Sequence, residues 1–433
     1  MSGKKSESHP PTAVLERFAS GTASADDRRV VVRHLLKGCA MCGQVASGAD
    51  RNGWSEGVTV DAFLERSAQE SAELVARFCS ERSAAAEIVQ KIAPLTGAQR
   101  RLLLNNLPAK RRRAVCELLI ERSRESRHHN ARETLTYAEL AVLVSQGIEG
   151  THADEPRSRA WAELGNARRI LADLAGAEQA LDEAERLFDR GGADPLFQAE
   201  LYSLRGSLAQ YQRRFDLAFQ LLHRSFRLFE RHEDLNGATR ALLKLALAHV
   251  YRGDPEEGLP HAERALALAA GSEDTRLKLY AFHNLVLILT EAGRVDEAAW
   301  HAHRVRPLFD AAGHRLDRLR FDWLTTRIGA ELGVLEPAAR AFDRLRKGYA
   351  DEGMPFEAAL VSLDLAAVYA RLGERRKLRL LAQETQEILR SLGVGRDHLA
   401  ALFLLARSEG AEAVRLVANL RKVVEGARDG RHS

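Results

Sequence analysis

The chain has 433 residues, of which 45% are hydrophobic and 29% are charged, a composition typical of folded proteins and not of disordered ones. Its 64 Lys and Arg against 60 Asp and Glu leave a net charge of +4, so the overall charge does not require a polyanionic partner. Four cysteines are too few for a disulfide scaffold, and no apolar run approaches the ~20 residues that a membrane-spanning helix needs.

The N-terminal segment MSGKKSESHPP has no apolar stretch of the kind found in signal peptides. We therefore predict a cytoplasmic protein with reduced thiols and no membrane partner. Two short helices are expected next, in PTAVLERFASG and in SADDRRVVVRHLLKG. Ser24 is a candidate N-cap of the second helix, with Asp27 three residues later, and Gly38 is a plausible C-terminal stop.

A group of potential metal ligands surrounds these two helices. His34 lies in the last turn of the second helix, and Cys39 and Cys42 follow directly, while His9 precedes the first helix. Zinc favours four nitrogen or sulfur ligands in a tetrahedron, and Cys-x-x-Cys can supply two of them from a single turn. Two small helices bury little apolar surface, so a structural metal is one way to hold them together.

This arrangement resembles the zinc-binding anti-sigma-factor domain, whose pattern is an upstream His or Cys followed by H-x3-C-x2-C. Here the spacing is H-x4-C-x2-C. The resemblance covers residues 9–46 and implies structural Zn²⁺ on His9, His34, Cys39 and Cys42. The alternative is a domain that keeps the helices and binds no metal. A thioredoxin-type redox role is disfavoured because it needs a βαβ context that the sequence lacks.

Residues 58–150 predict further helices with a degenerate hairpin pattern. FLERSAQESAELVARF and AVCELLIERSRESRHH show apolar spacing of three and four, interrupted at APLTG and NLPAK. Cys79 and Cys116 fall inside these helices, and we expect both to be buried. Residues 109–132 hold eight Lys or Arg against three Glu, but without aromatic residues for base stacking. A solvated helix face is favoured over a nucleic-acid site.

An internal repeat dominates residues 158–392. Small or apolar residues recur twelve positions apart, as in Gly165 with Ala177 and Gly206 with Ala218, and the first members step through 165, 206, 246, 286, 326 and 366. Glycines at 253, 293, 333 and 373 fall in the same phase, between the two helices of each unit. Six units of 40–41 residues predict an array of helical hairpins.

The repeat resembles the tetratricopeptide repeat, whose W-L-G…A-F-A order is matched best by Trp161, Leu164 and Gly165 and then by Ala177, Leu181 and Ala184. The resemblance implies an all-α, right-handed solenoid with a 40-residue period, preceded by the small zinc-finger-like head. Residues 397–427 predict helices that cap the array.

We find no P-loop, no GxGxxG after a strand, no HExxH and no GxSxG, so the sequence does not indicate an enzyme or a small-molecule substrate. His283, His301 and His303 fall in one unit, and scattered surface imidazoles are their favoured interpretation. The tetratricopeptide likeness implies a concave groove lined by the first helices. Its predicted residues are Arg159, Asn166, Arg169, Gln210, Tyr211, Arg240, Tyr251, Tyr280, His283, Arg320, Trp323, Arg327 and Arg371.

Guanidinium and aromatic groups along a groove suit an extended peptide that carries carboxylates. For any single Tyr or Trp, packing between neighbouring units is an equal alternative. The sequence thus favours a non-catalytic interaction scaffold that binds a protein or peptide with acidic groups. The alternative is a transcription-linked regulator that acts on a sigma factor or nucleic acid through the head and residues 109–132.

Overall fold

The computed structural model describes residues 10–19, 22–24, 27, 28, 30, 31, 60–92, 94–127, 130–150 and 152–391. It separates into two compact units, Met1–Glu81 and Arg82–Ser433. Every regular element among the described residues is a helix, which confirms the predicted all-α repeat fold. None of these helices is both long and apolar enough to cross a membrane. The predicted zinc ligands His9, His34, Cys39 and Cys42 and the predicted cap at 397–427 lie outside the described residues.

The described part of the first unit contains α1 (Thr12–Ala19) and the start of the next helical segment. The backbone N–H of Asp27 donates to Ser24 Oγ at 3.1 Å, which confirms the predicted N-cap. Leu15 and Val31 are buried against each other, and Arg17 forms an ion pair with Asp27 at 3.0 Å. The long helix α4 (Val60–Ile92) begins in this unit and ends in the second.

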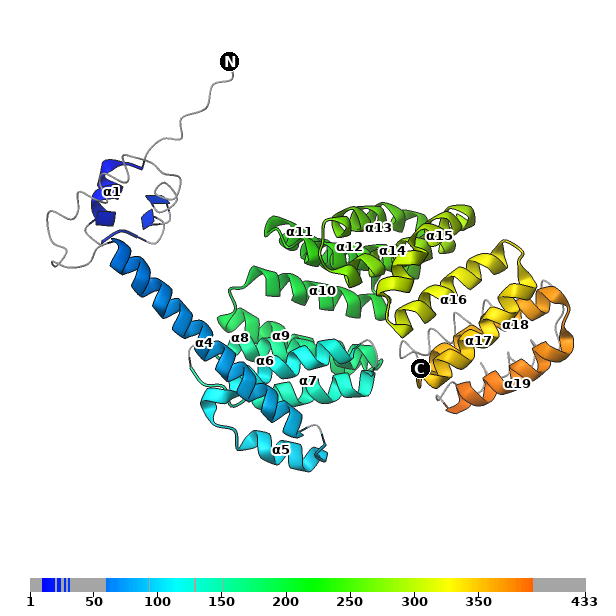
Figure 1. The fold of residues 1–433 in the computed structure, drawn as a ribbon, viewed down its shortest axis with the longest axis horizontal. Coiled ribbons are helices and arrows are strands. Elements are labelled where there is room, and N and C mark those ends of the chain that lie inside the picture. The colour runs from blue at the N-terminus through cyan, green and yellow to red at the C-terminus, as the bar shows by residue number, and fades with distance from the viewer. Residues whose placement is uncertain are drawn as a thin grey trace, which may run out of the picture. The chain divides into compact units, whose positions relative to one another are not determined.

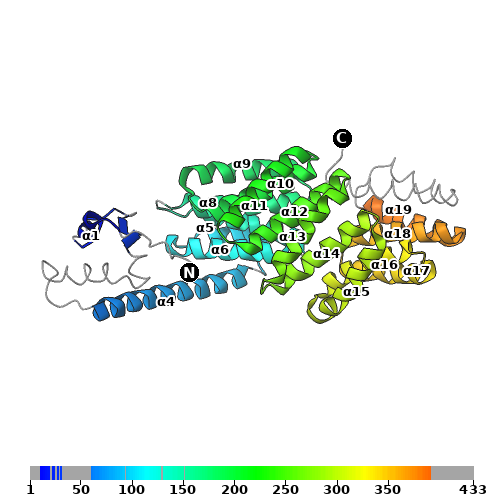
Figure 2. The same cartoon turned by 90° about the horizontal axis from the view of Figure 1, so that it is seen from above.

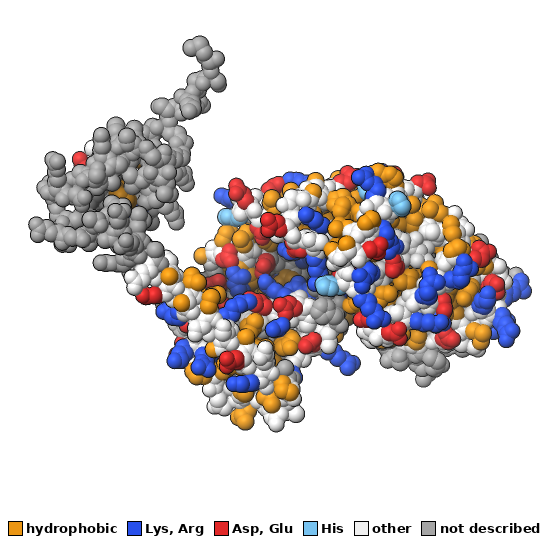
Figure 3. All heavy atoms as spheres, in the orientation of Figure 1, with side chains coloured by type: hydrophobic (Ala, Val, Ile, Leu, Met, Phe, Trp, Pro, Cys, Tyr) orange, Lys and Arg blue, Asp and Glu red, His pale blue; other side chains and the backbone are white. Residues whose placement is uncertain are grey.

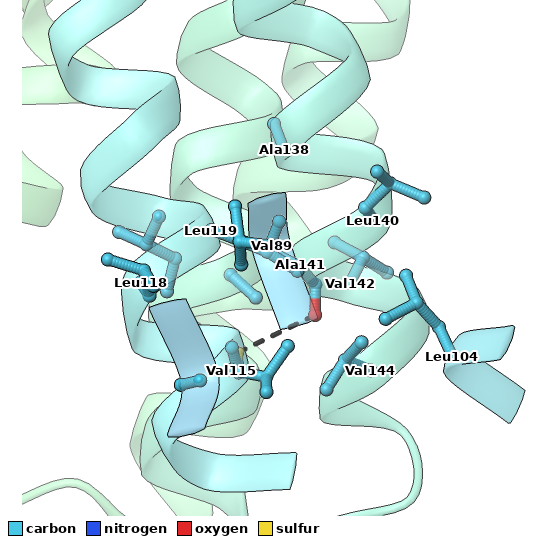
Figure 4. Close-up of a cluster of buried hydrophobic side chains, with 14 of the residues drawn as sticks. Val89, Leu104, Val115, Leu118, Leu119, Ala138, Leu140, Ala141, Val142 and Val144 are labelled. Atoms are coloured by element: carbon cyan, nitrogen blue, oxygen red, sulfur yellow. Dashed lines mark hydrogen bonds between the residues drawn. The ribbon is translucent and has the colours of Figure 1, made fainter. Parts of the chain in front are cut away.

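The second unit starts with the C-terminal part of α4, followed by α5 (Gly97–Asn105), α6 (Ala109–Ser126) and α7 (Ala131–Ser145). Their apolar faces form one cluster around Leu104, Val115 and Leu119, shown in Figure 4. Cys116 is buried there, as predicted, and its thiol donates to the Ala141 carbonyl at 3.6 Å. The prediction for Cys79 was wrong. It is exposed because the α4 residues that enter this core begin only at Ala85.

Six further hairpins stack in succession along the rest of the described chain (Figures 1 and 2). Each pairs a first helix with a second helix that runs back beside it. The hairpins are α8 (Asp154–Ile170) with α9 (Leu174–Gly191), α10 (Pro195–Tyr211) with α11 (Phe215–Arg231), α12 (Leu235–Arg252) with α13 (Pro255–Ala270), α14 (Thr275–Glu291) with α15 (Val295–Ala312), α16 (Arg315–Glu331) with α17 (Leu335–Asp351), and α18 (Pro355–Leu372) with α19 (Arg375–Ser391).

The twelve-residue pairs mark the places where two helices approach closely. A Cβ placed on Gly165 would lie 2.7 Å from Leu181 Cγ, and one on Gly206 would lie 2.7 Å from Leu222 Cγ, so no larger side chain fits without displacement. The in-phase glycines have a different role. Gly253 ends α12 in the left-handed conformation at φ 106°, which lets the chain reverse into the second helix.

Charged pairs connect neighbouring hairpins on the surface of the second unit. Their members lie 34 to 38 residues apart, close to one repeat length. They are Arg240 with Asp274, Arg327 with Glu291 and Arg346 with Glu384. Exposed pairs of this kind contribute little stability, about 0–1 kcal/mol each. Apolar packing in the continuous series of clusters therefore supplies most of the stability of the array.

Candidate functional site

One polar residue recurs at the same level of five successive first helices. Ser123, Glu163, Ser203, Lys244 and Asn284 follow each other at intervals of 40 or 41 residues and are buried or half-buried. Two adjacent pairs are in direct contact. Ser123 Oγ donates to Glu163 Oε1 at 3.2 Å, and Lys244 Nζ donates to Ser203 Oγ at 2.6 Å. We call these five residues the polar row. It lies among apolar positions that pack the hairpins together.

At the N-terminal end of the polar row, opposite charges are matched. Glu163 is only 2% exposed, and it accepts from Arg124 Nε at 3.3 Å. Arg127 lies 3.6 Å from the same carboxylate, and the other end of Arg124 pairs with Glu200 at 3.0 Å. A buried carboxylate needs such partners, because moving an ion out of water costs several kcal/mol of desolvation free energy.

Beyond this end of the row, basic side chains lack acidic partners among the described residues. Within that part of the chain, Lys244 donates only to Ser203, to its hydroxyl and to its carbonyl oxygen at 3.3 Å. Arg169 on α8 donates through Nη2 to Asn166 at 2.9 Å and lies over the Tyr211 ring, but no described residue accepts a hydrogen bond from its buried Nε. Neither side chain, nor that of Arg320, has a carboxylate within ion-pair distance in the described part of the chain. Burial and the charges of Arg169 and Arg127 lower the pKa of Lys244 to about 7.

Side chains from four first helices converge near Tyr280 of α14. Desolvation raises the pKa of its hydroxyl, and the charges of Arg320 on α16 and Arg169 on α8 act on the same group. Tyr280 is nevertheless 45% exposed. A side chain can be open to solvent and yet desolvated when it lies in the wall of a concave surface. Next to it, desolvation and the Arg320 charge lower the pKa of His283 to about 4.

The space-filling view agrees with a concave surface. Figure 3 shows a hollow beside α10, the helix that carries Glu200, Ser203 and Tyr211, and basic side chains gather along it. We call the surface formed by Arg169, Tyr211, Lys244, Tyr280, His283 and Arg320 the basic groove. It combines phenol rings with basic side chains that form no ion pair within the described part of the chain, and these groups bind carboxylates and flat amide or aromatic groups.

The predicted groove residues separate into two sets. Arg169, Tyr211, Tyr280, His283 and Arg320 lie in the basic groove, with Asn166 as the acceptor for Arg169. The second set connects neighbouring repeats. Its members are Arg159 on Asp194, Arg240 on Asp274, Trp323 on Asp364, Arg327 on Glu291 and Arg371 on the Ala330 carbonyl. Gln210 is half-buried beside Tyr211, and Tyr251 is 49% exposed at the end of α12.

Sequence reasoning missed Lys244 and the polar row to which it belongs. The signal was present, because the 40-residue phase that identified the small residues also aligns Ser123, Glu163, Ser203, Lys244 and Asn284. Apolar periodicity alone does not identify polar residues that recur with the same period.

The basic segment at 109–132 is largely neutralised within the chain. Arg113 pairs with Glu117 at 3.1 Å, and Arg122 pairs with Glu125 at 3.1 Å, while Arg124 and Arg127 hold Glu163. Arg112 donates to two backbone carbonyls. These contacts favour a structural role for most of the cations and weaken the case for a nucleic-acid site on α6.

The sequence predicts scattered imidazoles at His283, His301 and His303, and the three side chains lie in different surroundings. His283 lies in the basic groove, His301 packs edge-on against Trp300, and His303 is exposed. A separate group forms between α11, α12 and α13. The ring centroid of His261 lies 5.5 Å from that of His249 and 5.8 Å from that of His223.

No protein-family model matches the chain, and no curated protein sequence matches it. Solved structures do share its fold. Aspartyl phosphate phosphatase F from Bacillus subtilis is 12% identical, with a TM-score of 0.51 over 90% of this chain and 96% of its own. A Rap protein complexed with competence and sporulation factor is 12% identical, with a TM-score of 0.50 over 80% of this chain and 99% of its own.

A third similar structure is a signal-transduction ATPase with numerous domains and a tetratricopeptide repeat sensor, from Pyrococcus horikoshii. It is 13% identical, with a TM-score of 0.53 over 78% of this chain and 52% of its own. At these identities the likeness shows the fold alone, a tetratricopeptide-like array of helical hairpins.

Proposed function

We propose that the chain is a non-catalytic regulatory scaffold that binds an acidic segment of a protein or peptide in the basic groove. The observation that carries this proposal is the convergence of three basic side chains, Arg169, Lys244 and Arg320, which have no carboxylate partner among the described residues, next to exposed Tyr280. An anionic partner would supply the missing charge. The structurally similar Rap protein, which is complexed with competence and sporulation factor, supports a bound factor on this type of fold.

The groove chemistry supports binding rather than catalysis. Its groups are guanidinium, amine, phenol and imidazole, and the nearby carboxylates Glu163 and Glu200 are engaged in ion pairs with Arg124. Acid–base catalysis needs a group that titrates near neutral pH and can reach the substrate; Lys244 meets the first condition, but its amine is held by the hydroxyl and the carbonyl oxygen of Ser203. The imidazole of His283 stays neutral far below that range, because desolvation lowers its pKa to about 4.

Charge reversal of Arg320 tests the proposal. The full chain, immobilised, is used to capture partners from a lysate of its source, and bound proteins and peptides are identified by mass spectrometry. We expect Arg320→Glu to lower the affinity of the captured partner roughly tenfold or more, because a half-buried cation would become an anion. Arg318→Glu is the matched control, since this exposed arginine lies two residues away on the same helix.

Circular dichroism would verify that both variants keep the helicity of the parent. Capture of the same partners with unchanged affinity by Arg320→Glu would contradict the assignment of the groove. An equal loss in both variants would also contradict it, because the effect would then be one of general charge.

We further propose that residues 9–46 hold one structural Zn²⁺ on His9, His34, Cys39 and Cys42. The support is the ligand types and their spacing in the sequence. Elemental analysis of the purified chain, compared with Cys39→Ser, tests it. We expect one zinc per chain in the parent and a loss of zinc in the variant.

A further inference from the structure

The further inference concerns one position in the basic groove and rests on the proposed function. Lys244 on α12 is held by Ser203 on α10 and faces the charges of Arg169 on α8 and Arg127 on α6. Glu200 on α10 and Arg240 on its own helix complete the charged groups around it. Glu200 is already bound to Arg124, and Arg240 to Asp274, so neither supplies Lys244 with a direct partner.

The hydrogen bonds of Lys244 match the neutral form of its amine. A neutral amine has two N–H groups, and Lys244 makes two hydrogen bonds, to Ser203 Oγ and to the Ser203 carbonyl oxygen. An ammonium has a third N–H. No described residue can accept a hydrogen bond from this third N–H. Protonation of Lys244 therefore requires a further hydrogen-bond acceptor that the described residues do not supply.

Arg169 presents a second unused donor. Its guanidinium is fixed by Asn166 and by the ring of Tyr211, which lies 4.9 Å from the Arg169 Cζ. Its Nε–H is buried and has no acceptor among the residues that the structure describes. Buried donors are nearly always satisfied in folded proteins, and an unsatisfied one in a site calls for a ligand or a water molecule. The Arg169 charge acts on the Lys244 amine, and a guanidinium and an amine near one another can both donate to a single carboxylate.

We propose that Arg169 and Lys244 form a subsite for one carboxylate of the bound segment, and that the Lys244 amine takes up one proton when this carboxylate binds. In the free chain the amine is mainly neutral above pH 7, which avoids three mutually repelling cations at Arg127, Arg169 and Lys244. The incoming carboxylate supplies the negative charge that makes the ammonium favourable. The proton comes from solvent, and no covalent bond is formed.

The test is calorimetry on the full chain with three peptides: acetyl-(Glu-Ala)4-amide, acetyl-(Gln-Ala)4-amide, and acetyl-(Gln-Ala)4 with a free terminal carboxylate. Heats are compared in Tris and HEPES, whose ionisation enthalpies differ, so that the difference reports proton uptake. With a lysine pKa of about 7, we expect about 0.9 proton taken up at pH 8 and about 0.1 at pH 6. The amidated Gln peptide should not bind, and the third peptide shows whether a terminal carboxylate can replace a side chain.

Two variants separate the role of charge from that of structure. Lys244→Met removes the amine but keeps the apolar stem, and it should weaken binding of the carboxylate peptide roughly ten- to hundredfold at pH 6 with no proton uptake at pH 8. Lys244→Arg carries a permanent charge, so it should bind without proton uptake at either pH. A purely structural lysine would not produce this difference in proton uptake.

Binding by the parent chain at pH 8 without any dependence on the buffer would overturn proton uptake. Unchanged binding by Lys244→Met would overturn the subsite. If no carboxylate peptide binds the parent while partner capture remains sensitive to Arg320→Glu, the subsite is overturned and the proposed function stands. If that capture is also insensitive, the proposed function fails as well.

Discussion

At the scale of single residues, Glu163 shows how the chain holds a buried charge. It is almost fully buried on α8, and Arg124, Arg127 and the Ser123 hydroxyl all point to its carboxylate. The two arginines are themselves 39% and 30% exposed, so solvent weakens the electrostatic part of the interaction. The contact nevertheless joins three helices, because the single O–H of Ser123 on α6 is shared between the Glu163 carboxylate on α8 and the Thr134 carbonyl at the start of α7.

We expect Glu163→Gln to lower the free energy of unfolding by about 2 kcal/mol, because Arg124 and Arg127 lose the negative charge of Glu163. This loss is smaller than for a fully buried pair, since both arginines are partly exposed. Glu297→Gln on α15 is the control. Its ion pair with Arg294 is exposed, so the substitution should leave the free energy of unfolding almost unchanged. Urea unfolding at neutral pH measures both. Equal effects in the two variants would contradict a special role for Glu163.

At the scale of helices, three imidazoles couple α11, α12 and α13. His223, His249 and His261 lie ring to ring, and Phe219 packs on His249 at 4.4 Å between centroids. Desolvation, followed by the charges of His249 and His223, lowers the pKa of His261 to about 4, and desolvation also lowers the pKa of the other two. The folded contact is therefore favourable while all three rings are neutral.

The pH dependence of stability follows from these pKa values. In the unfolded chain each histidine titrates near 6.5, above its pKa in the folded chain, so the unfolded state binds more protons as the pH falls. We expect stability to be fully present above about pH 6.5 and to decrease from there toward pH 4. Urea unfolding midpoints at pH 7.5 and 5 measure this decrease. It should become smaller in His261→Gln, and an unchanged decrease in that variant would contradict the assignment.

Helix positions were the most predictable level of this structure. The 40-residue period placed the hairpins because each apolar stripe, such as Ala177, Leu181 and Ala184, must face its partner helix whatever lies farther away. The groove was less predictable. Trp323 and Arg320 lie on one helix three residues apart, yet Trp323 donates to Asp364 of the next hairpin at 2.6 Å while Arg320 acts on Tyr280. The stacking of the hairpins decides which side chains make contacts between neighbouring hairpins. The sequence of a single repeat does not reveal that stacking.

At the scale of the second unit, stability is passed between neighbouring hairpins. Phe309 of α15 and Phe321 of α16 stack with their ring centroids 3.9 Å apart and join two successive hairpins. Each hairpin in such an array contacts mainly the units before and after it, so stability is approximately a sum of local terms and nearest-neighbour terms. A defect in one contact should therefore act locally.

We expect Phe321→Ala to destabilise the array by about 3 kcal/mol, because a fully buried ring would leave a cavity. Amide hydrogen exchange should become faster in α14–α17 and remain unchanged in α8 and α9. Mass spectrometry of peptic fragments can locate the change. A uniform increase across all described helices would indicate that the array unfolds as one cooperative unit and would contradict the nearest-neighbour description.

The charged pairs between hairpins repeat in the same phase as the hairpins themselves. Arg240 pairs with Asp274, the residue that precedes α14, and Asp234 stands at the same place before α12. Arg327 pairs with Glu291 at the end of α14, and Glu331 stands at the same place at the end of α16. A duplicated copy of either hairpin would therefore meet an acidic group as well as an apolar face, so duplication of a hairpin can lengthen this array without loss of these pairs.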